Sequence, residues 1–92
     1  MKKLIQSFLI LTSISVPFYV LGYEEEDIPL ADVPKIVLEA AYNAWSGITL
    51  TEAEKITDNS NVSYELEGTV NKKEIEILIS NDGNIISMDE DD

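Results

Sequence analysis

The sequence contains no cysteine, no histidine and no arginine among its 92 residues. Without cysteine the chain can form neither disulfides nor a thiol nucleophile. Without histidine it can build neither a Ser–His triad nor a zinc site of the usual kind. It also has no glycine-rich phosphate-binding loop. We therefore expect a non-enzymatic protein with no catalytic residues, no metal site and no cofactor.

Positive charge is scarce in this chain, whose net charge is −12. All 18 acidic residues follow Gly22, and only four lysines do, which gives residues 23–92 a net charge of −14. Phosphate backbones and anionic membrane surfaces repel such a protein, so we expect no nucleic-acid partner. A basic protein partner or weakly bound divalent cations remain open.

The first 22 residues differ from the rest of the chain. Met1-Lys2-Lys3 is basic, the segment that follows is mainly apolar, and Gly22 precedes a run of acidic residues. This layout is typical of a signal peptide cleaved after Gly22. An uncleaved membrane anchor is the alternative, but six polar or proline residues interrupt the apolar segment. We expect a secreted or periplasmic protein without stable membrane insertion after cleavage.

The remaining residues are enough for one small domain, and two acidic segments flank it. Residues 23–31 have no apolar period and predict a flexible acidic lead-in. Residues 89–92 are all acidic and predict a solvated tail, which could hold divalent ions loosely. The folded domain is expected over residues 32–88.

A helix is predicted to open this domain. Asp32 can cap free backbone N–H groups, and Pro34 suits the first turn. Gly47 is expected to end the helix, because glycine adopts the left-handed conformation at little cost. Apolar residues recur at three- and four-residue steps on one helix face: Val33, Val37, Ala40, Ala41 and Ala44.

After the helix the apolar period changes from 3.6 to 2, which predicts strands at residues 52–57, 62–67, 74–79 and 85–88. Asp82-Gly83 indicates a two-residue hairpin turn. That turn pairs Ile79 with Ile86 and Ile77 with Met88. For the first hairpin, we place Ile56 inward and opposite Val62.

A loop centred on Asn71-Lys72 pairs Leu66 with Ile77 and Tyr64 with Ile79, which keeps every inward residue apolar. The expected fold class is α+β, with one N-terminal helix packed on a four-stranded antiparallel sheet. Tyr64 and Trp45 are interpreted as core residues. The helix is expected to cover one sheet face, made of Val62, Tyr64, Leu66, Ile75, Ile77, Ile79 and Ile86.

The other sheet face is expected to lie open to solvent. Glu67 would lie directly opposite Glu76, and like charges at facing positions are destabilising. This face is either a solvated surface that keeps the protein soluble or a docking face for a basic partner. A catalytic carboxylate pair is disfavoured, because no pocket that would separate two pKa values is indicated. The candidate partner-binding residues are Glu65, Glu67, Glu74, Glu76 and Leu78.

The segment Asn81-Asp82-Gly83-Asn84 is similar to part of a calcium loop. The full spacing of oxygen ligands that ends in glutamate is absent, so we interpret the segment as a turn.

Four segments in this order resemble a PepSY-like domain, of the branch described as similar to β-lactamase-inhibitor proteins. They are Val33-Pro34 with Val37, Tyr64-Glu65-Leu66-Glu67, Glu74-Ile75-Glu76-Ile77 and Asp82-Gly83-Asn84-Ile85-Ile86. The resemblance covers about residues 30 to 90. Tyr64, Asp82 and Gly83 match the family pattern as structural positions, and the family has no catalytic motif to transfer.

The resemblance implies a helix on an antiparallel sheet and an exported protein of the cell envelope. Related domains in propeptides of secreted metallopeptidases imply a role in restraining proteases. Members often carry two such domains in tandem, whereas this chain has room for one. The resulting hypothesis is an exported binding module that inhibits or regulates a secreted or periplasmic enzyme such as a protease. A protein that binds or senses divalent cations such as calcium is the alternative, and a subunit that dimerises through its sheet is a third.

Overall fold

The computed structural model describes residues 22–91, with the side chain of Asp91 excepted. The expected signal peptide, apart from Gly22, lies outside the described residues. None of the helices in the described part of the chain is long and apolar enough to cross a membrane.

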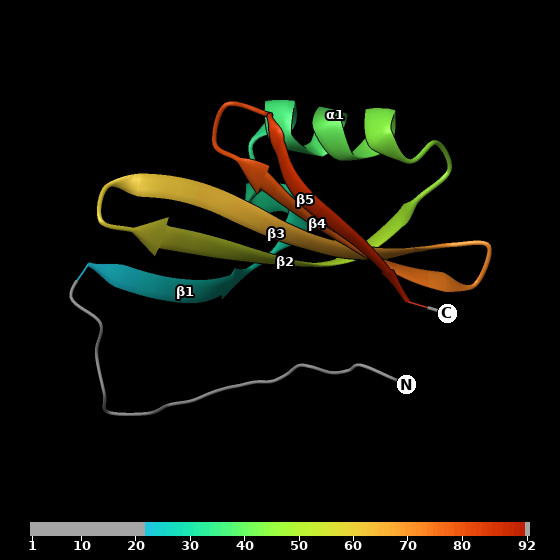
Figure 1. The fold of residues 1–92 in the computed structure, drawn as a ribbon, viewed down its shortest axis with the longest axis horizontal. Helices are drawn as coiled ribbons and strands as arrows, with labels where there is room; N and C mark the ends of the chain where they lie inside the picture. Colours follow the sequence, from blue (N-terminus) through green and yellow to red (C-terminus); the bar gives the residue numbers. More distant parts are fainter. Residues whose placement is uncertain (1–21, 92) are drawn as a thin grey trace.

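The fold is a five-stranded antiparallel sheet in which each strand lies beside its neighbours in the sequence, in the order β1-β2-β3-β4-β5 (Figure 1). One helix, α1, packs on one side of the sheet, mainly over β4. The elements are β1 (Tyr23–Ile28), a 3-10 turn (Leu30–Asp32), α1 (Lys35–Ala44), β2 (Thr49–Asp58), β3 (Asn61–Val70), β4 (Lys73–Ser80) and β5 (Ile85–Asp91).

The prediction of four strands behind an N-terminal helix was wrong, because residues 23–28 form a fifth strand. β1 pairs with β2 from Tyr23 opposite Asp58 to Ile28 opposite Ala53, and α1 lies between these two strands in the sequence. Residues 24–27 are all acidic and exposed, so the sequence shows no apolar alternation that would predict this strand. Backbone hydrogen bonds along the edge of β2 hold this strand, and such bonds do not depend on apolar side chains.

The helix begins and ends differently from the prediction. Asp32 does not cap it, since Asp32 belongs to the 3-10 turn and Pro34 occupies the N-cap position without a side-chain hydrogen bond. The helix ends at Ala44, before Gly47. Gly47 has the expected positive φ of 86°, but it serves the turn that leads into β2.

The core lies between α1 and the sheet. Val37 and Ala41 of the helix are fully buried, as are Leu66, Ile77 and Ile79 of the strands. The expected inward set is confirmed for the central strands, and Tyr64 is buried with it. Trp45 and Val62 are half-buried and pack against this core. The remaining buried apolar side chains are Val33, Ile48, Ala53 and Ile75.

The β3–β4 pairing is confirmed at every position that was predicted. Asn71 and Lys72 both have positive φ, at 52° and 69°, which is the conformation of a type I′ hairpin turn. Leu66 therefore lies opposite Ile77 and Tyr64 opposite Ile79.

The prediction of a two-residue turn at Asp82-Gly83 was wrong. Gly83 N–H donates to the Ser80 carbonyl at 2.9 Å, Ser80 N–H donates to the Asn84 carbonyl at 2.8 Å, and Gly83 has a φ of 91°. These bonds define a three-residue loop with a bulge. Ile79 consequently pairs with Ile85 rather than Ile86, although Ile77 does pair with Met88.

Two side chains expected in the core therefore lie elsewhere. Ile86 is 55% exposed. Ile56 pairs with Ser63 and Glu25 instead of Val62, and alternation from buried Ala53 directs it away from the helix. The acidic tail also differs from the expected solvated segment, because residues 89–91 continue β5.

Candidate functional site: an acidic sheet face

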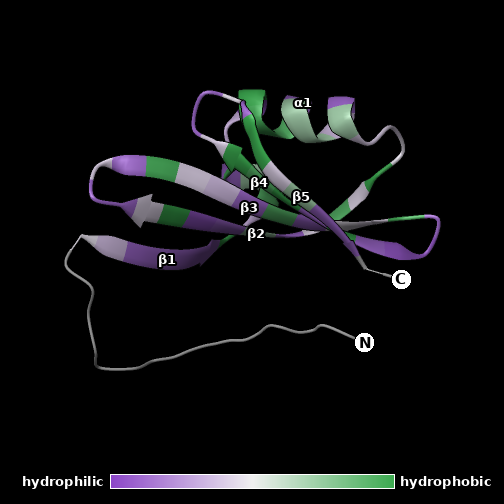
Figure 2. Cartoon of the chain, in the orientation of Figure 1, coloured by the Kyte–Doolittle hydropathy of each residue, from purple (hydrophilic) through white to green (hydrophobic). Residues whose placement is uncertain are grey.

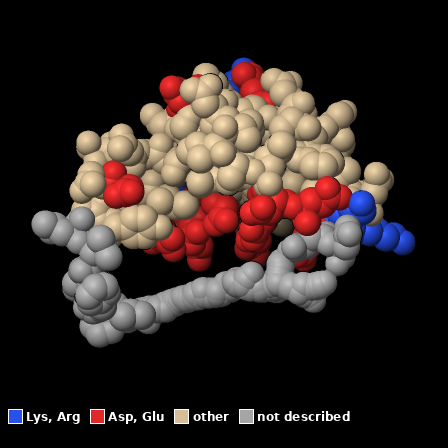
Figure 3. Space-filling model, viewed as in Figure 1, with Lys and Arg blue, Asp and Glu red and all other residues tan. Residues whose placement is uncertain are grey.

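The sheet face opposite α1 is dominated by carboxylates, and we call it the acidic face. Alternation along the paired strands assigns its members. Figure 3 shows acidic side chains gathered on the side of the molecule away from the helix of Figure 1. The acidic residues of this face are Glu25, Asp27, Glu52, Glu54, Asp58, Glu65, Glu67, Glu74, Glu76 and Asp89.

The predicted partner-binding residues all belong to this face. Glu65, Glu67, Glu76 and Leu78 are half-buried, and Glu74 is exposed near the start of β4. Glu67 lies opposite Glu76 as predicted.

Sequence reasoning missed the acidic residues that β1, β2 and β5 add. The i, i+2 spacing of Glu25 with Asp27 and of Glu52 with Glu54 was a detectable signal for two further acidic strand faces.

A β-bulge brings Glu52 onto the acidic face. The β2–β3 register shifts between Leu50 and Glu52, and the side-chain hydroxyl of Thr51 donates to the Glu67 carbonyl at 3.2 Å. Leu50 packs against the core, whereas Glu52 is exposed. Without the extra residue, alternation would direct both side chains to the same side of the sheet.

Like charges face each other repeatedly across these strands. Glu52 lies opposite Glu67, and Glu54 lies between Asp27 on β1 and Glu65 on β3. Directly opposed like charges destabilise a sheet. The strand register therefore places negatively charged side chains where they repel one another.

The lysines of the described residues do not project from this face. Lys55 of β2 pairs with buried Tyr64 of β3, so its side chain lies on the helix side of the sheet. Lys35 belongs to α1. Lys72 is in the β3–β4 turn, and Lys73 forms a 3.0 Å salt bridge with Glu90. The carboxylates of the acidic face thus have no cationic side chain among them in the part of the chain that the structure describes.

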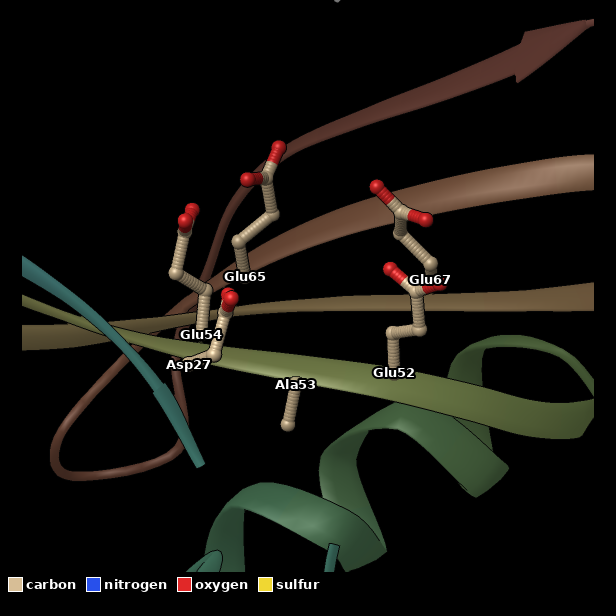
Figure 4. A pocket seen from close by; sticks show the side chains of 6 residues that line it. All are labelled: Asp27, Glu52, Ala53, Glu54, Glu65 and Glu67. Atoms are coloured by element: carbon tan, nitrogen blue, oxygen red, sulfur yellow. The ribbon is translucent and has the colours of Figure 1, made fainter. Parts of the chain in front are cut away.

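The carboxylates surround a shallow hollow of about 60 Å³ (Figure 4). Figure 4 shows Glu54, Glu65 and Glu67 projecting to one side of the sheet and Ala53 projecting to the other, towards the helix. A wider hollow of about 360 Å³ adjoins it, and its lining adds apolar residues at the exit of β1. Asp27, Glu52 and Ala53 line both hollows.

Partial burial and mutual repulsion change the acidity of this cluster. Burial, then a hydrogen bond with Glu54 and the negative charge of Glu76, raises the pKa of Glu65 to about 7. Burial and the charge of Glu25 also raise the pKa of Glu54. The interaction between these two carboxyls raises the pKa of Glu65 and lowers that of Glu54.

The Glu67 carboxyl is perturbed in the same way. Burial, then the negative charges of Glu52 and Glu76, raises its pKa to about 7.

Tyr23, at the start of β1, donates its hydroxyl hydrogen to the Glu25 carboxylate at 2.6 Å. Burial and this bond raise the pKa of Tyr23. Several groups on this surface therefore favour the protonated form.

The arrangement suits binding better than metal coordination. Within residues 22–91 no group of three or more carboxylates is arranged to hold a metal ion. The face offers instead a broad surface of negative charge with two shallow hollows.

No family model, curated protein or solved structure matches the chain.

Proposed function

We propose that this chain is an exported, non-enzymatic binding module of the cell envelope that docks a basic protein partner on its acidic face. One observation carries the proposal: carboxylates face carboxylates across neighbouring strands, with no described lysine among them. Cationic side chains of a partner would neutralise charges that now repel one another. Complementary charge also accelerates encounter and suppresses wrong partners.

The hollow shared by Asp27 and Glu52 supports this form of recognition. Its apolar lining, from Ile28, Pro29 and Leu30, can pack against the aliphatic stem of a lysine or arginine. The two carboxylates can then accept hydrogen bonds from the charged end.

The resemblance to PepSY-like domains supports a secreted or periplasmic enzyme as the partner. Related domains in metallopeptidase propeptides make a protease the enzyme class that we propose, with restraint of its activity as the effect of binding. This assignment is separable from the docking face, since a basic partner of another class would use the same carboxylates.

A pull-down from cell-envelope extracts with matched variants tests the proposal. The test variant is Glu67→Lys/Glu76→Lys on the acidic face. The control is Glu24→Lys/Glu39→Lys, which changes the net charge equally. Both control residues lie outside the acidic face. Glu39 is an exposed residue of α1, and Glu24 lies on the opposite side of β1 from Glu25 and Asp27.

We expect a protein that the original chain and the control retain and the test variant releases. Isothermal titration with the purified partner should give a dissociation constant that rises with salt. If the partner is an enzyme, its activity should fall as the chain is added. Equal recovery of every captured protein by both variants would contradict the proposal.

A further inference from the structure

The outer edge of β5 is a second surface that could bind a partner. β5 is the last strand in the sheet and pairs with β4 alone among the described residues. Its other edge therefore presents free backbone N–H and C=O groups, which can pair with another chain. The opposite edge, β1, carries four consecutive acidic residues, whereas residues 85–88 carry no charge.

Apolar side chains are exposed along and beside the first half of β5. Ile85, Ile86 and Met88 are 39%, 55% and 47% exposed. Ile36 of α1 is also exposed and lies against the β4–β5 turn, where its side chain reaches within 2.9 Å of the position that a Cβ on Gly83 would occupy. The apolar surface thus extends from the start of the helix to this strand.

The second half of β5 is acidic. Figure 2 shows the strand changing from hydrophobic near the β4–β5 turn to hydrophilic towards its end. Asp89 lies opposite Glu76, and Glu90 binds Lys73 on β4. The edge therefore presents an ordered pattern, apolar first and acidic second.

We propose that the β5 edge binds an extended segment of a partner protein, antiparallel to β5, in which basic residues precede apolar ones. An antiparallel segment places its N-terminal half beside residues 89–91 and its C-terminal half beside residues 85–88. Basic residues followed by apolar residues then match both halves, while main-chain hydrogen bonds supply affinity. Every pairing in this sheet is antiparallel, the geometry with the more stable ladder.

A second copy of the chain fits this edge less well. Two β5 strands paired antiparallel would place the acidic half of each beside the apolar half of the other. The acidic residues of each copy would gain no cationic partner from the other copy. Charge complementarity therefore favours a basic–apolar segment over self-association.

Synthetic peptides test this inference directly. The probe is a fluorescein-labelled eight-residue peptide with lysine at alternate positions of its first half and valine throughout its second half. One control has the same residues in reverse order. Two others carry N-methyl groups on alternate backbone nitrogens, in the two possible phases, so that one of them blocks pairing with β5. Binding to the purified full chain is measured by fluorescence anisotropy.

We expect saturable binding of the forward peptide, at least about tenfold tighter than that of the reversed peptide and of one N-methylated peptide. Ile86→Glu/Met88→Glu should weaken binding by a similar factor, and circular dichroism checks that this variant keeps its sheet. Equal binding of the forward and reversed peptides, or no effect of either N-methylation pattern, would overturn the inference. A concentration-dependent dimer in sedimentation that Ile86→Glu/Met88→Glu abolishes would overturn it in favour of self-association.

This edge adjoins the acidic face at Asp89, which pairs with Glu76, and the same assay separates the two surfaces. Glu52→Lys/Glu67→Lys, which changes facing carboxylates on β2 and β3, should leave the preference for forward over reversed peptide unchanged. Loss of all peptide binding in that variant would show that the cationic probe sits on the acidic face instead, and would overturn the β5 assignment.

Discussion

Glu54 of β2 and Glu65 of β3 lie directly opposite each other, so their carboxyls can form a hydrogen bond only when one of them holds a proton. Their backbones are fixed by the ladder, so the two carboxyls cannot separate by a large distance without disturbing the sheet. Asp27 and Glu25 approach the pair from β1, Glu67 and Glu52 lie further along, and Glu76 comes from β4. The protonation of this cluster is therefore linked to the stability of the fold.

Stability should fall as pH rises from about 5 to about 8. The pKa values of Glu65 and Glu67 are about 7 in the folded chain against a reference of 4.5. Between these values the folded state binds more protons than the unfolded state, so the free energy of unfolding decreases with pH. Below the reference value this stabilisation is complete. The measurement is urea unfolding at several pH values, monitored by Trp45 fluorescence. Urea is uncharged, so it does not screen the interactions between the carboxylates.

Matched variants identify the source of this dependence. Glu65→Gln/Glu67→Gln should flatten the pH profile and raise the urea midpoint at about pH 8. Glu24→Gln/Glu39→Gln removes the same charge outside the acidic face and should retain most of the slope. An equal flattening in both would show that overall net charge, rather than the facing carboxylates, controls stability. A midpoint that rises with pH in the original chain would contradict the linkage itself.

Two isoleucines that were both predicted to lie in the core should lose very different amounts of stability when truncated to alanine. Ile77 has 0% exposure, whereas Ile86 is 55% exposed. Ile77→Ala should lower the free energy of unfolding by about 2–5 kcal/mol through lost burial and a residual cavity. Ile86→Ala should change it by about 0.5 kcal/mol or less. Similar losses for both in urea unfolding would mean that the bulge at the β4–β5 turn is absent in solution.

Two glycines should differ because one is limited by space and the other by backbone conformation. A Cβ on Gly68 would overlap the Thr49 carbonyl oxygen, whereas a Cβ on Gly47 would meet no atom within 4 Å but would sit on a backbone with a φ of 86°. Gly47→Ala should cost about 1–2 kcal/mol from left-handed strain. Gly68→Ala should cost more, since the β2 backbone must move next to the bulge. Equal urea midpoints for the two variants would contradict this order.

The central part of the fold could be predicted from sequence because two signals agreed there. Alternation in β3 and β4 and the Asn71-Lys72 turn lead to the same register, and a slip of one residue would expose Leu66 or Ile77 to water. No such agreement exists at Asp82-Gly83. Glycine with positive φ suits both a two-residue turn and a three-residue loop with a bulge, and hydrogen bonds to Ser80 decide between them.

The acidic face could be predicted only in part, for a related reason. Glu65, Glu67, Glu74 and Glu76 stand on strands that their apolar neighbours reveal. β1 has almost no apolar residues, so hydropathy gave no indication that backbone pairing would place its carboxylates beside those of β2. Likewise, the bulge that directs Glu52 outward depends on the β2–β3 ladder.

The order of the strands also bears on how the chain folds. Every strand pairs with its neighbour in the sequence, and short turns join β2 through β5. Contacts between residues close in sequence form with a small loss of chain entropy, so this meander should assemble rapidly for a sheet protein. β1 is the exception, because α1 and its flanking turns separate it from β2. We therefore expect β1 to be the last strand to join, completing the acidic face only when the rest of the sheet is in place.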